Sequence, residues 1–305
     1  MAGNKQVRVR IPATTANCGP GFDTLGIACT LYNEVVLELD GPKESVQLSL
    51  TGDGADTLPT NDRNLVLRSV RMVLERANAY DSGIRLSMHN VVPLSRGLGS
   101  SSAAIIGGLV AANTMLGTPF TKPELLDMAT KIEGHPDNVA PALYGGFTVS
   151  VVQGERVVCL QLPIPETLQL VVCIPDFRLS THKARQAIPT TIPHQDAVFN
   201  VSRTALLVGA LATGRTEYLS DALDDRLHQP YRAPLIPGMT EVFAAGIKAG
   251  ALGVTMSGAG PSLMAYTTEK AEAVGEAMVK EFSAQGISSR YLKLGIDYEG
   301  ARVIE

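Results

Sequence analysis

Hydrophobic and polar residues alternate with a period of two in three short stretches of the N-terminal part. These stretches, Gln6 to Ile11, Val35 to Asp40 and Ile84 to Met88, are predicted to be half-buried strands. From Asn64 to Ala77 apolar residues recur every three or four positions instead, which predicts a helix. This part of the chain therefore combines strands with an amphipathic helix.

Longer helical patterns follow in the middle of the chain and beyond. Ser100 to Met115 consists mainly of small and apolar residues, so we expect a helix buried on most sides. Lys122 to Ile132 is amphipathic, and Thr121 is a suitable N-cap because Pro123 and Glu124 follow in the first turn. The remaining predicted helices are Ala197 to Ala212, Met239 to Ala249 and Lys270 to Gln285.

Strand patterns between these helices define the rest of the architecture. Phe147 to Val152 and Arg156 to Leu160 are predicted to form a hairpin around Gly154-Glu155. Further strands are predicted at Leu168 to Ile174, Gly253 to Met256, Leu263 to Tyr266 and Ser289 to Leu294. The sequence thus predicts an α+β fold. Pro163-Ile164-Pro165 is the best linker candidate and divides the chain into domains 1–165 and 166–305.

Composition and charge exclude several classes of protein. The net charge is −4, aromatic residues make up only 5%, and Trp is absent, so we expect no nucleic-acid partner. No segment reaches the ~20 apolar residues that span a bilayer, and the N-terminus lacks the apolar core of a signal peptide. The four cysteines show no CxxC spacing, which favours reduced thiols. We therefore expect a soluble cytoplasmic protein with no membrane partner.

The stretch PLSRGLGSSSAA, residues 93–104, precedes the predicted buried helix and indicates an anion site. The N-terminus of a helix carries free N–H groups and partial positive charge, and Gly97 and Gly99 permit an anion to approach the backbone closely. The alternative is a Ser-capped helix without a ligand. The stretch is not a P-loop because it lacks the lysine, and Ser102 stands where a GxGxxG motif needs its third glycine.

Two other stretches determine which kind of anion site this is. They are PATTANCGPGFDTLG, residues 12–26, and SGAGPS, residues 257–262. Together with residues 93–104, they resemble the three motifs of the GHMP kinase superfamily, in the expected order and across nearly the full chain. The resemblance implies a GHMP kinase fold, with a ribosomal S5-like N-terminal domain and a ferredoxin-like C-terminal domain. It also implies ATP and Mg²⁺ as cofactors.

Further residues resemble one branch of that superfamily, whose members phosphorylate L-homoserine on the route to threonine. The similar segments are EGHPDNVAPA at 133–142, STHKAR at 180–185 and QPYRAPLIPG at 229–238. The resemblance implies transfer of a phosphoryl group from ATP to the L-homoserine hydroxyl, giving O-phospho-L-homoserine. It also implies a homodimer.

The substrate carries a carboxylate, an ammonium group and a hydroxyl, and the resemblance assigns residues to each. Arg185 and Arg232 would clamp the carboxylate, because a guanidinium fork pairs both oxygens. Asp23 would balance the ammonium charge, with Asn17 adding a hydrogen bond. The alternative interpretations are solvated surface charges and, for Asn17, a role in a turn.

Residues of the segment 133–142 would act at the hydroxyl. Asn138 would orient it, while His135 either lines the same pocket or is a structural histidine. Asp137 is a minority candidate for a catalytic base. We favour catalysis by positioning, because phosphoryl transfer depends mainly on alignment and charge stabilisation.

The nucleotide half of the site would be built around the helix that begins near Ser100. We expect Ser101 and Glu133 to bind Mg²⁺, with Ser100 as the rival ligand. Asn64 either contacts adenine or caps a helix. The residues expected around ATP are Asn64, Pro93, Leu94, Ser95, Arg96, Gly97, Leu98, Gly99, Ser100, Ser101, Ser102 and Ala103.

Two other functions stay open at this point. A GHMP kinase for mevalonate or a sugar would share the ATP motifs but would not need Asp23 and Asn17 as partners of an ammonium group. A non-catalytic member of the superfamily would bind nucleotide without turnover, and it usually has an eroded motif. Cys18 lies within the first motif, which would expose its thiol to reagents at the site.

Overall fold

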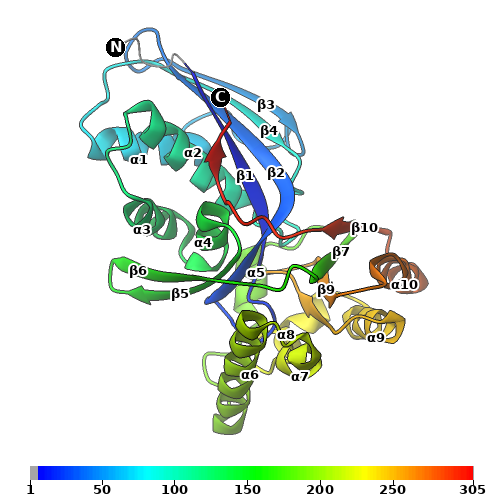
Figure 1. Ribbon diagram of the computed structural model, residues 1–305. Helices are drawn as coiled ribbons and strands as arrows, with labels where there is room; N and C mark the ends of the chain where they lie inside the picture. Colours follow the sequence, from blue (N-terminus) through cyan, green and yellow to red (C-terminus); the bar gives the residue numbers. More distant parts are fainter. Residues whose placement is uncertain (1–5, 305) are drawn as a thin grey trace.

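Two β-sheets organise the structure, which is a computed structural model that describes residues 6–304 (Figure 1). The first sheet has the strand order β11-β1-β2-β4-β3, with β5 paired to β2 and β6 paired to β5. The second sheet has the order β10-β7-β9-β8. The strands of the first sheet are β1 (Val7–Ala16), β2 (Leu25–Leu39), β3 (Val46–Gly52), β4 (Ile84–Asn90), β5 (Phe147–Gln153), β6 (Arg156–Leu162) and β11 (Arg302–Val303).

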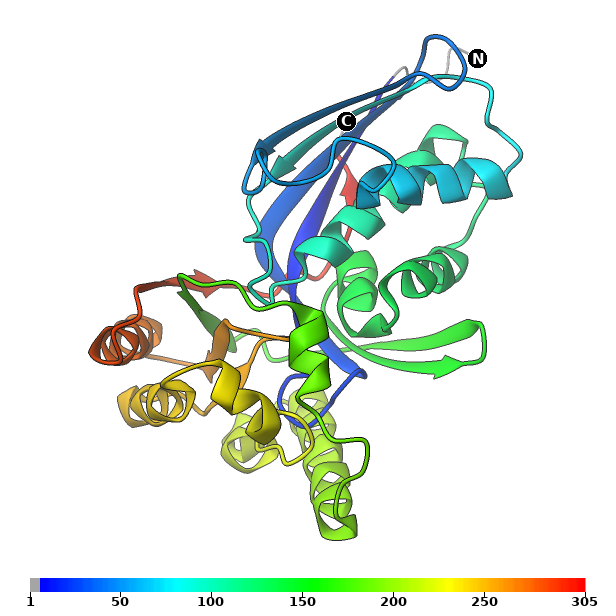
Figure 2. The same ribbon diagram turned by 180° about the vertical axis from the view of Figure 1, so that it is seen from behind.

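Four helices gather on one side of the first sheet, as Figure 2 shows from behind. They are α1 (Leu65–Arg76), α2 (Ser100–Met115), α3 (Lys122–Glu133) and α4 (Pro136–Tyr144). α2 is the buried one, and its small residues explain why. A Cβ on Gly107 would lie 2.7 Å from Val35, and one on Gly108 would lie 2.6 Å from the carbonyl oxygen of Val66. α2 therefore packs tightly between the sheet and α1, as its composition predicted.

The second sheet has ferredoxin-like topology. Its elements follow the order β7-α9-β8-β9-α10-β10, the β-α-β-β-α-β arrangement, with all strand pairs antiparallel. They are β7 (Gln169–Pro175), α9 (Met239–Ala249), β8 (Gly253–Met256), β9 (Leu263–Thr267), α10 (Ala271–Ala284) and β10 (Ser289–Leu294). Between β7 and α9 the chain inserts α5 (Thr181–Gln186), α6 (His194–Thr213), η1 (Thr216–Tyr218), α7 (Leu219–Ala222), α8 (Gln229–Arg232) and η2 (Ala233–Leu235).

The α+β prediction is confirmed, and most predicted elements lie within a few residues of their expected positions. The strand predicted from Val35 is wrong at its start, because β2 begins at Leu25. Its first five residues are all buried, which removes the alternation that marks a strand. The predicted domain division at residue 165 falls between β6 and β7, while β11 returns to pair with β1. None of the described helices is long and apolar enough to cross a membrane.

Candidate active site

A cavity of about 370 Å³ lies where the two sheets meet, and it collects most of the predicted site residues. Segments from both halves line it: the turn after β1, the segment 93–101, the start of α4, α5, and residues 258–260. The predicted residues that line it are Asn17, Asp23, Asn64, Pro93, Leu94, Ser95, Arg96, Gly97, Leu98, Gly99, Ser100, Ser101, Glu133, His135, Asp137, Asn138, Arg185 and Arg232. Ser102 and Ala103 are buried in α2 and do not line it.

The N-terminus of α2 opens into this cavity. Its N-cap is Gly99 at φ 69°, so the helix is not Ser-capped and no side chain of the described residues caps it. Its first turn also holds no acidic residue. The N–H groups and positive end of the helix dipole are therefore available to an anion.

The segment 257–262 packs against the loop 93–99 that precedes α2 and forms hydrogen bonds with its backbone. A Cβ on Gly97 would lie 2.1 Å from the carbonyl oxygen of Ser257, so only glycine permits the approach. Ser257 Oγ donates a hydrogen bond to the carbonyl oxygen of Gly97 at 2.6 Å, and Ser262 N donates to that of Arg96 at 3.3 Å. The third motif thus fixes the backbone of the second.

Ser101 and Glu133 lie together at the first turn of α2. Ser101 Oγ donates to Glu133 Oε1 at 2.8 Å, and Ser102 Oγ donates to the same oxygen at 3.0 Å. A hydroxyl and a carboxylate next to a phosphate site form a donor set that suits Mg²⁺. Ser100 lines the cavity as well but has no hydrogen bond to Glu133. The arrangement fits the ion, with Ser101 as the better placed serine.

Asp23 and Arg185 both line the cavity and form a bidentate ion pair. Arg185 Nη2 and Nη1 donate to Asp23 Oδ1 and Oδ2 at 2.6 and 2.9 Å. This hydrogen bonding to Asp23 raises the pKa of Arg185. Asn17 is engaged by backbone: its Oδ1 accepts from Asp23 N at 3.0 Å and its Nδ2 donates to the Gly258 carbonyl at 2.9 Å. Asn17 therefore shapes the turn that carries Asp23.

Arg232 is a buried cation, with only 1% of its surface exposed. It donates to the backbone carbonyls of Ala184 and Gly258, at 3.0 and 3.2 Å, but pairs with no carboxylate in residues 6–304. Desolvation, and next the charge of Arg185, lower its pKa to about 10. A buried guanidinium in this state favours an anionic ligand.

Two residues around these arginines were not predicted from the sequence. The ring of Phe22 lies 5.4 Å from the guanidinium carbon of Arg185 and 5.2 Å from that of Arg232. His228 Nδ1 lies 3.3 Å from Arg232 Nη1, and burial lowers the pKa of this histidine. The sequence offered one indication for Phe22, because it directly precedes Asp23 in the first motif.

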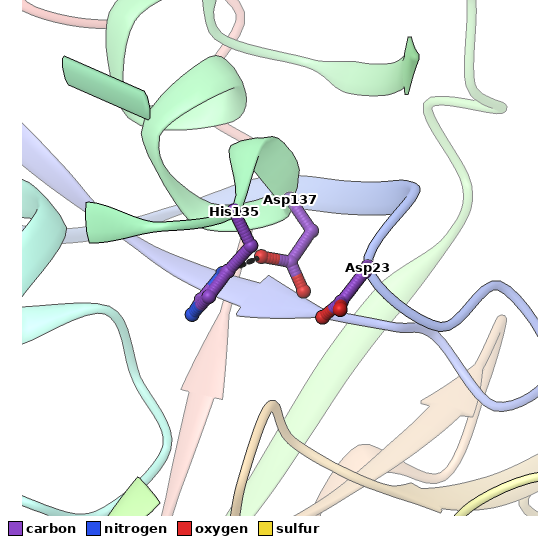
Figure 3. A group of neighbouring side chains, drawn as sticks. All are labelled: Asp23, His135 and Asp137. Carbon is purple, nitrogen blue, oxygen red and sulfur yellow. Dashed lines mark hydrogen bonds and ion pairs between the residues drawn. The ribbon is translucent and has the colours of Figure 1, made fainter. Parts of the chain in front are cut away.

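The start of α4 presents a chain of hydrogen bonds to the cavity. His135 Nδ1 lies 2.5 Å from Asp137 Oδ1 (Figure 3). Burial lowers the pKa of His135, but the bond to Asp137 outweighs it and the net shift is upward. Asn138 Nδ2 donates to Asp137 Oδ1 at 3.4 Å, and Thr14 Oγ1 donates to Asn138 Oδ1 at 2.7 Å. His135 lines the cavity and is also held structurally.

Gly99 is the last residue of the loop 93–99, which we call the phosphate loop, and it contacts the hydrogen-bonded side chains of Thr14 and Asn138. A Cβ at Gly99 would lie 1.9 Å from Thr14 Oγ1 and 3.2 Å from Asn138 Oδ1. The N-terminus of α2 is therefore in direct contact with Asn138. An anion bound at the helix and a group oriented by Asn138 would be neighbours.

Asn64 is observed as a helix cap. Its Oδ1 accepts from the backbone N of Val66 and Leu67, at 2.9 and 3.2 Å, and its Nδ2 donates to the Pro59 carbonyl at 2.9 Å. It lines the cavity with apolar residues that were not predicted, namely Leu58, Pro59, Leu65 and Met88. This apolar end of the cavity suits a flat ring such as adenine.

The expectation that Cys18 reacts with thiol reagents is wrong. Its side chain is fully buried, and burial raises its pKa to about 12. Thiol chemistry needs an accessible thiolate, which this environment disfavours. All four cysteines are free, consistent with the reduced thiols expected.

Comparison with models of known protein families identifies the superfamily to which the chain belongs. The model for the GHMP kinases N terminal domain matches residues 64–146, and the model for the GHMP kinases C terminal domain matches residues 207–284. With the two sheets and the helix N-terminus in the cavity, these matches define a GHMP kinase.

Relatives that match over nearly their full length identify the family within this superfamily. The chain is 46% identical to the homoserine kinase of Moorella thermoacetica over 97% of this chain and 99% of that one. It is also 46% identical to the homoserine kinase of Carboxydothermus hydrogenoformans, over 97% and 96% of the two chains. The crystal structure of homoserine kinase from Cytophaga hutchinsonii matches with a TM-score of 0.92 and 34% identity, covering 100% of this chain and 99% of that chain. The chain belongs to the homoserine kinase family.

Proposed function

We propose that the protein transfers the γ-phosphoryl group of ATP to the hydroxyl of L-homoserine, giving ADP and O-phospho-L-homoserine. The observation that carries this proposal is Arg232, a buried cation that shares one cavity with the Asp23–Arg185 pair and the open N-terminus of α2. The cavity thus has one end for the charges of an amino acid and another for phosphates.

The amino-acid end is matched to a zwitterion. Asp23 and Arg185 are about one third exposed and satisfy each other without ligand. An α-carboxylate would take over the guanidinium of Arg185 and also meet Arg232, while an α-ammonium would take over Asp23. Each charge of the pair would be replaced by one of the same sign, so the exchange leaves no buried charge unpaired.

The nucleotide end would bind the phosphates at the N-terminus of α2, with the apolar wall around Asn64 next to adenine. Ser101 and Glu133 would hold Mg²⁺. When bound, the ion supplies charge neutralisation at the transferring phosphoryl group. Because Gly99 contacts Asn138, the γ-phosphate would lie beside the group that Asn138 orients.

Positioning explains the transfer without a strong base. Asn138 Oδ1 is fixed by Thr14 and one hydrogen of its Nδ2 points to Asp137, which leaves the second Nδ2 hydrogen to direct the substrate hydroxyl at the phosphate. Asp137 Oδ1 is shared by His135 and Asn138, so this carboxylate orients its neighbours. A loose phosphoryl-transfer transition state needs alignment and charge stabilisation more than proton removal.

Two substitutions test this mechanism. Asn138→Ala should lower kcat by at least about tenfold, since misplacing a reacting group by 1 Å can cost a hundredfold. Asp137→Asn keeps the shape and should leave kcat within a few-fold. Steady-state kinetics with saturating ATP and L-homoserine measure both. A collapse of kcat in Asp137→Asn, with Asn138→Ala active, would make Asp137 the base.

We also propose that the protein binds Mg²⁺, forms a homodimer and is located in the cytoplasm. A second copy would cover the face of the β5–β6 hairpin that exposes Val151, Val158 and Leu160 to between 48 and 57%. Val151 pairs directly with Val158, so their side chains share that face. Light scattering after size-exclusion chromatography measures the mass. A monomer at micromolar concentration would contradict the dimer.

A further inference from the structure

A second hollow, of about 490 Å³, lies on the other side of the phosphate loop. Four separate segments of the chain form it. Asp53 follows β3, Arg96 comes from the loop before α2, Asp176 and Arg178 come from the turn after β7, and Arg290 comes from the start of β10. The wall of this hollow is therefore shared between the phosphate loop and one end of the second sheet.

Positive charge exceeds negative charge in this hollow. Three arginines, Arg96, Arg178 and Arg290, face two carboxylates, Asp53 and Asp176. Asp53 Oδ2 is already engaged by Leu94 N at 2.6 Å, while Asp176 is 80% exposed and lies 3.5 Å from Arg96. The guanidinium groups of Arg178 and Arg290 form no hydrogen bond or ion pair with the rest of residues 6–304.

Arg96 is the least exposed of the three arginines, with a side chain 13% exposed. Its Nη1 is fully buried and has no hydrogen-bond partner among the described residues. Desolvation lowers its pKa, and the charges of Arg178 and Arg290 act in the same direction. A buried guanidinium donor without an acceptor costs free energy, which a bound acceptor would recover.

We propose that this hollow binds a phosphate-type oxyanion held by Arg96, Arg178 and Arg290. Guanidinium groups from three segments suit an acceptor with several oxygens around one centre, and charge-assisted bonds of this kind are strong. The hydroxyls of Ser288 and Ser289 line the same hollow and supply further donors.

Binding there would weaken the binding of ATP. Arg96 lines both cavities, so one side chain lies between the oxyanion and the triphosphate. Two anions on either side of one loop repel each other, and by linkage each lowers the affinity of the other. This coupling rests on the proposed ATP site, whereas the oxyanion site itself does not.

Calorimetric titration of inorganic phosphate into the nucleotide-free protein tests the site. The double variant Arg178→Gln/Arg290→Gln removes two exposed arginines outside the active site and should weaken this binding roughly tenfold. Arg156→Gln on β6 removes an exposed charge far from the hollow and should bind like the wild type. Equal phosphate affinity in the double variant and the wild type, or no binding to the wild type, would overturn the proposal.

Kinetics with L-homoserine then test the coupling. Phosphate should raise the KM for ATP to a plateau about fivefold above its starting value, and the double variant should lose this rise. Simple competition at the nucleotide site would instead raise KM without limit and persist in the double variant. That outcome would refute the coupling. If the protein shows no turnover on L-homoserine, the proposed function fails while the calorimetric result still decides the site.

Discussion

At the scale of single residues, Asp23 and Arg185 pair with each other, and in the proposed function this pair accounts for substrate selectivity. A ligand with only a carboxylate, such as mevalonate, would take Arg185 and leave Asp23 without a counter-charge. A sugar would satisfy neither. A zwitterionic amino acid is the ligand that replaces both halves of the pair.

Asp23→Asn tests the role of the carboxylate. It should lower kcat/KM for L-homoserine by at least about tenfold, because a hydrogen bond to a charged group is worth about 1.5–3 kcal/mol. The change should appear in KM for L-homoserine and not in KM for ATP. Asp81→Asn, an 87% exposed aspartate next to Lys43, is the matched control and should behave like the wild type. An unchanged KM for L-homoserine in Asp23→Asn would remove Asp23 from substrate binding.

His135 gives the site a pH dependence whose sign follows from its pKa. The pKa is raised in the folded protein, so the stabilisation by the His135–Asp137 contact is complete below the unfolded value near 6.5. It is lost as the pH rises through the folded value. The excess stability of the wild type over Asp137→Asn should therefore shrink from pH 5.5 to pH 9. Urea unfolding across this range measures it, and a constant difference would contradict the protonated contact.

At the scale of elements, the proposed phosphate site is the uncapped N-terminus of α2, whose preceding loop is held by the segment 257–262. The sequence predicted both ends of α2 correctly, because small residues mark its buried faces and glycines mark its entry. It could not decide between a ligand site and a Ser-capped helix. The structure rules out the Ser cap, because Gly99 stands at the N-cap, and it shows that the distant carbonyl of Ser257 packs against Gly97.

Gly97→Ala tests the contact between the two loops. Its Cβ would strike the Ser257 carbonyl, in addition to the strain of a positive φ, so the variant should lose about 1–3 kcal/mol of stability and bind ATP more weakly. Gly117→Ala is the matched control, with nearly the same φ but nothing within 4 Å of the new Cβ. It should show the backbone strain with normal ATP binding. Equal effects in both variants would mean that the contact is unimportant.

Other elements show where sequence patterns fail. β3 was not predicted, although Val46, Leu48 and Leu50 alternate with polar residues. α5, α7 and α8 are six residues or fewer, too short for a periodicity to appear. β11 has two residues and owes its existence to pairing with β1, nearly 300 positions away. Only tertiary contacts define such elements.

At the scale of the whole molecule, the active site exists because two sheets meet. The predicted residues came from motifs far apart in the sequence, and the fold brings most of them into one cavity. The sequence could not show that Asp23 pairs with Arg185, that Phe22 lies beside both arginines, or that a second basic hollow adjoins the phosphate loop. The relations around Arg185 and Arg232 depend on the packing of the α5–α8 insertion against the first sheet's loops, and the hollow depends on the turn after β7 and the start of β10 lying beside the loop before α2.

The central claim is that this cavity phosphorylates L-homoserine with ATP. A coupled ADP-release assay with Mg·ATP, comparing L-homoserine with mevalonate, galactose and L-threonine, tests it most directly. We predict strong turnover on L-homoserine and little on the other three. Turnover only on another alcohol would contradict the substrate assignment. Binding of ATP without turnover on any of the four compounds would contradict the claim that the protein is a kinase.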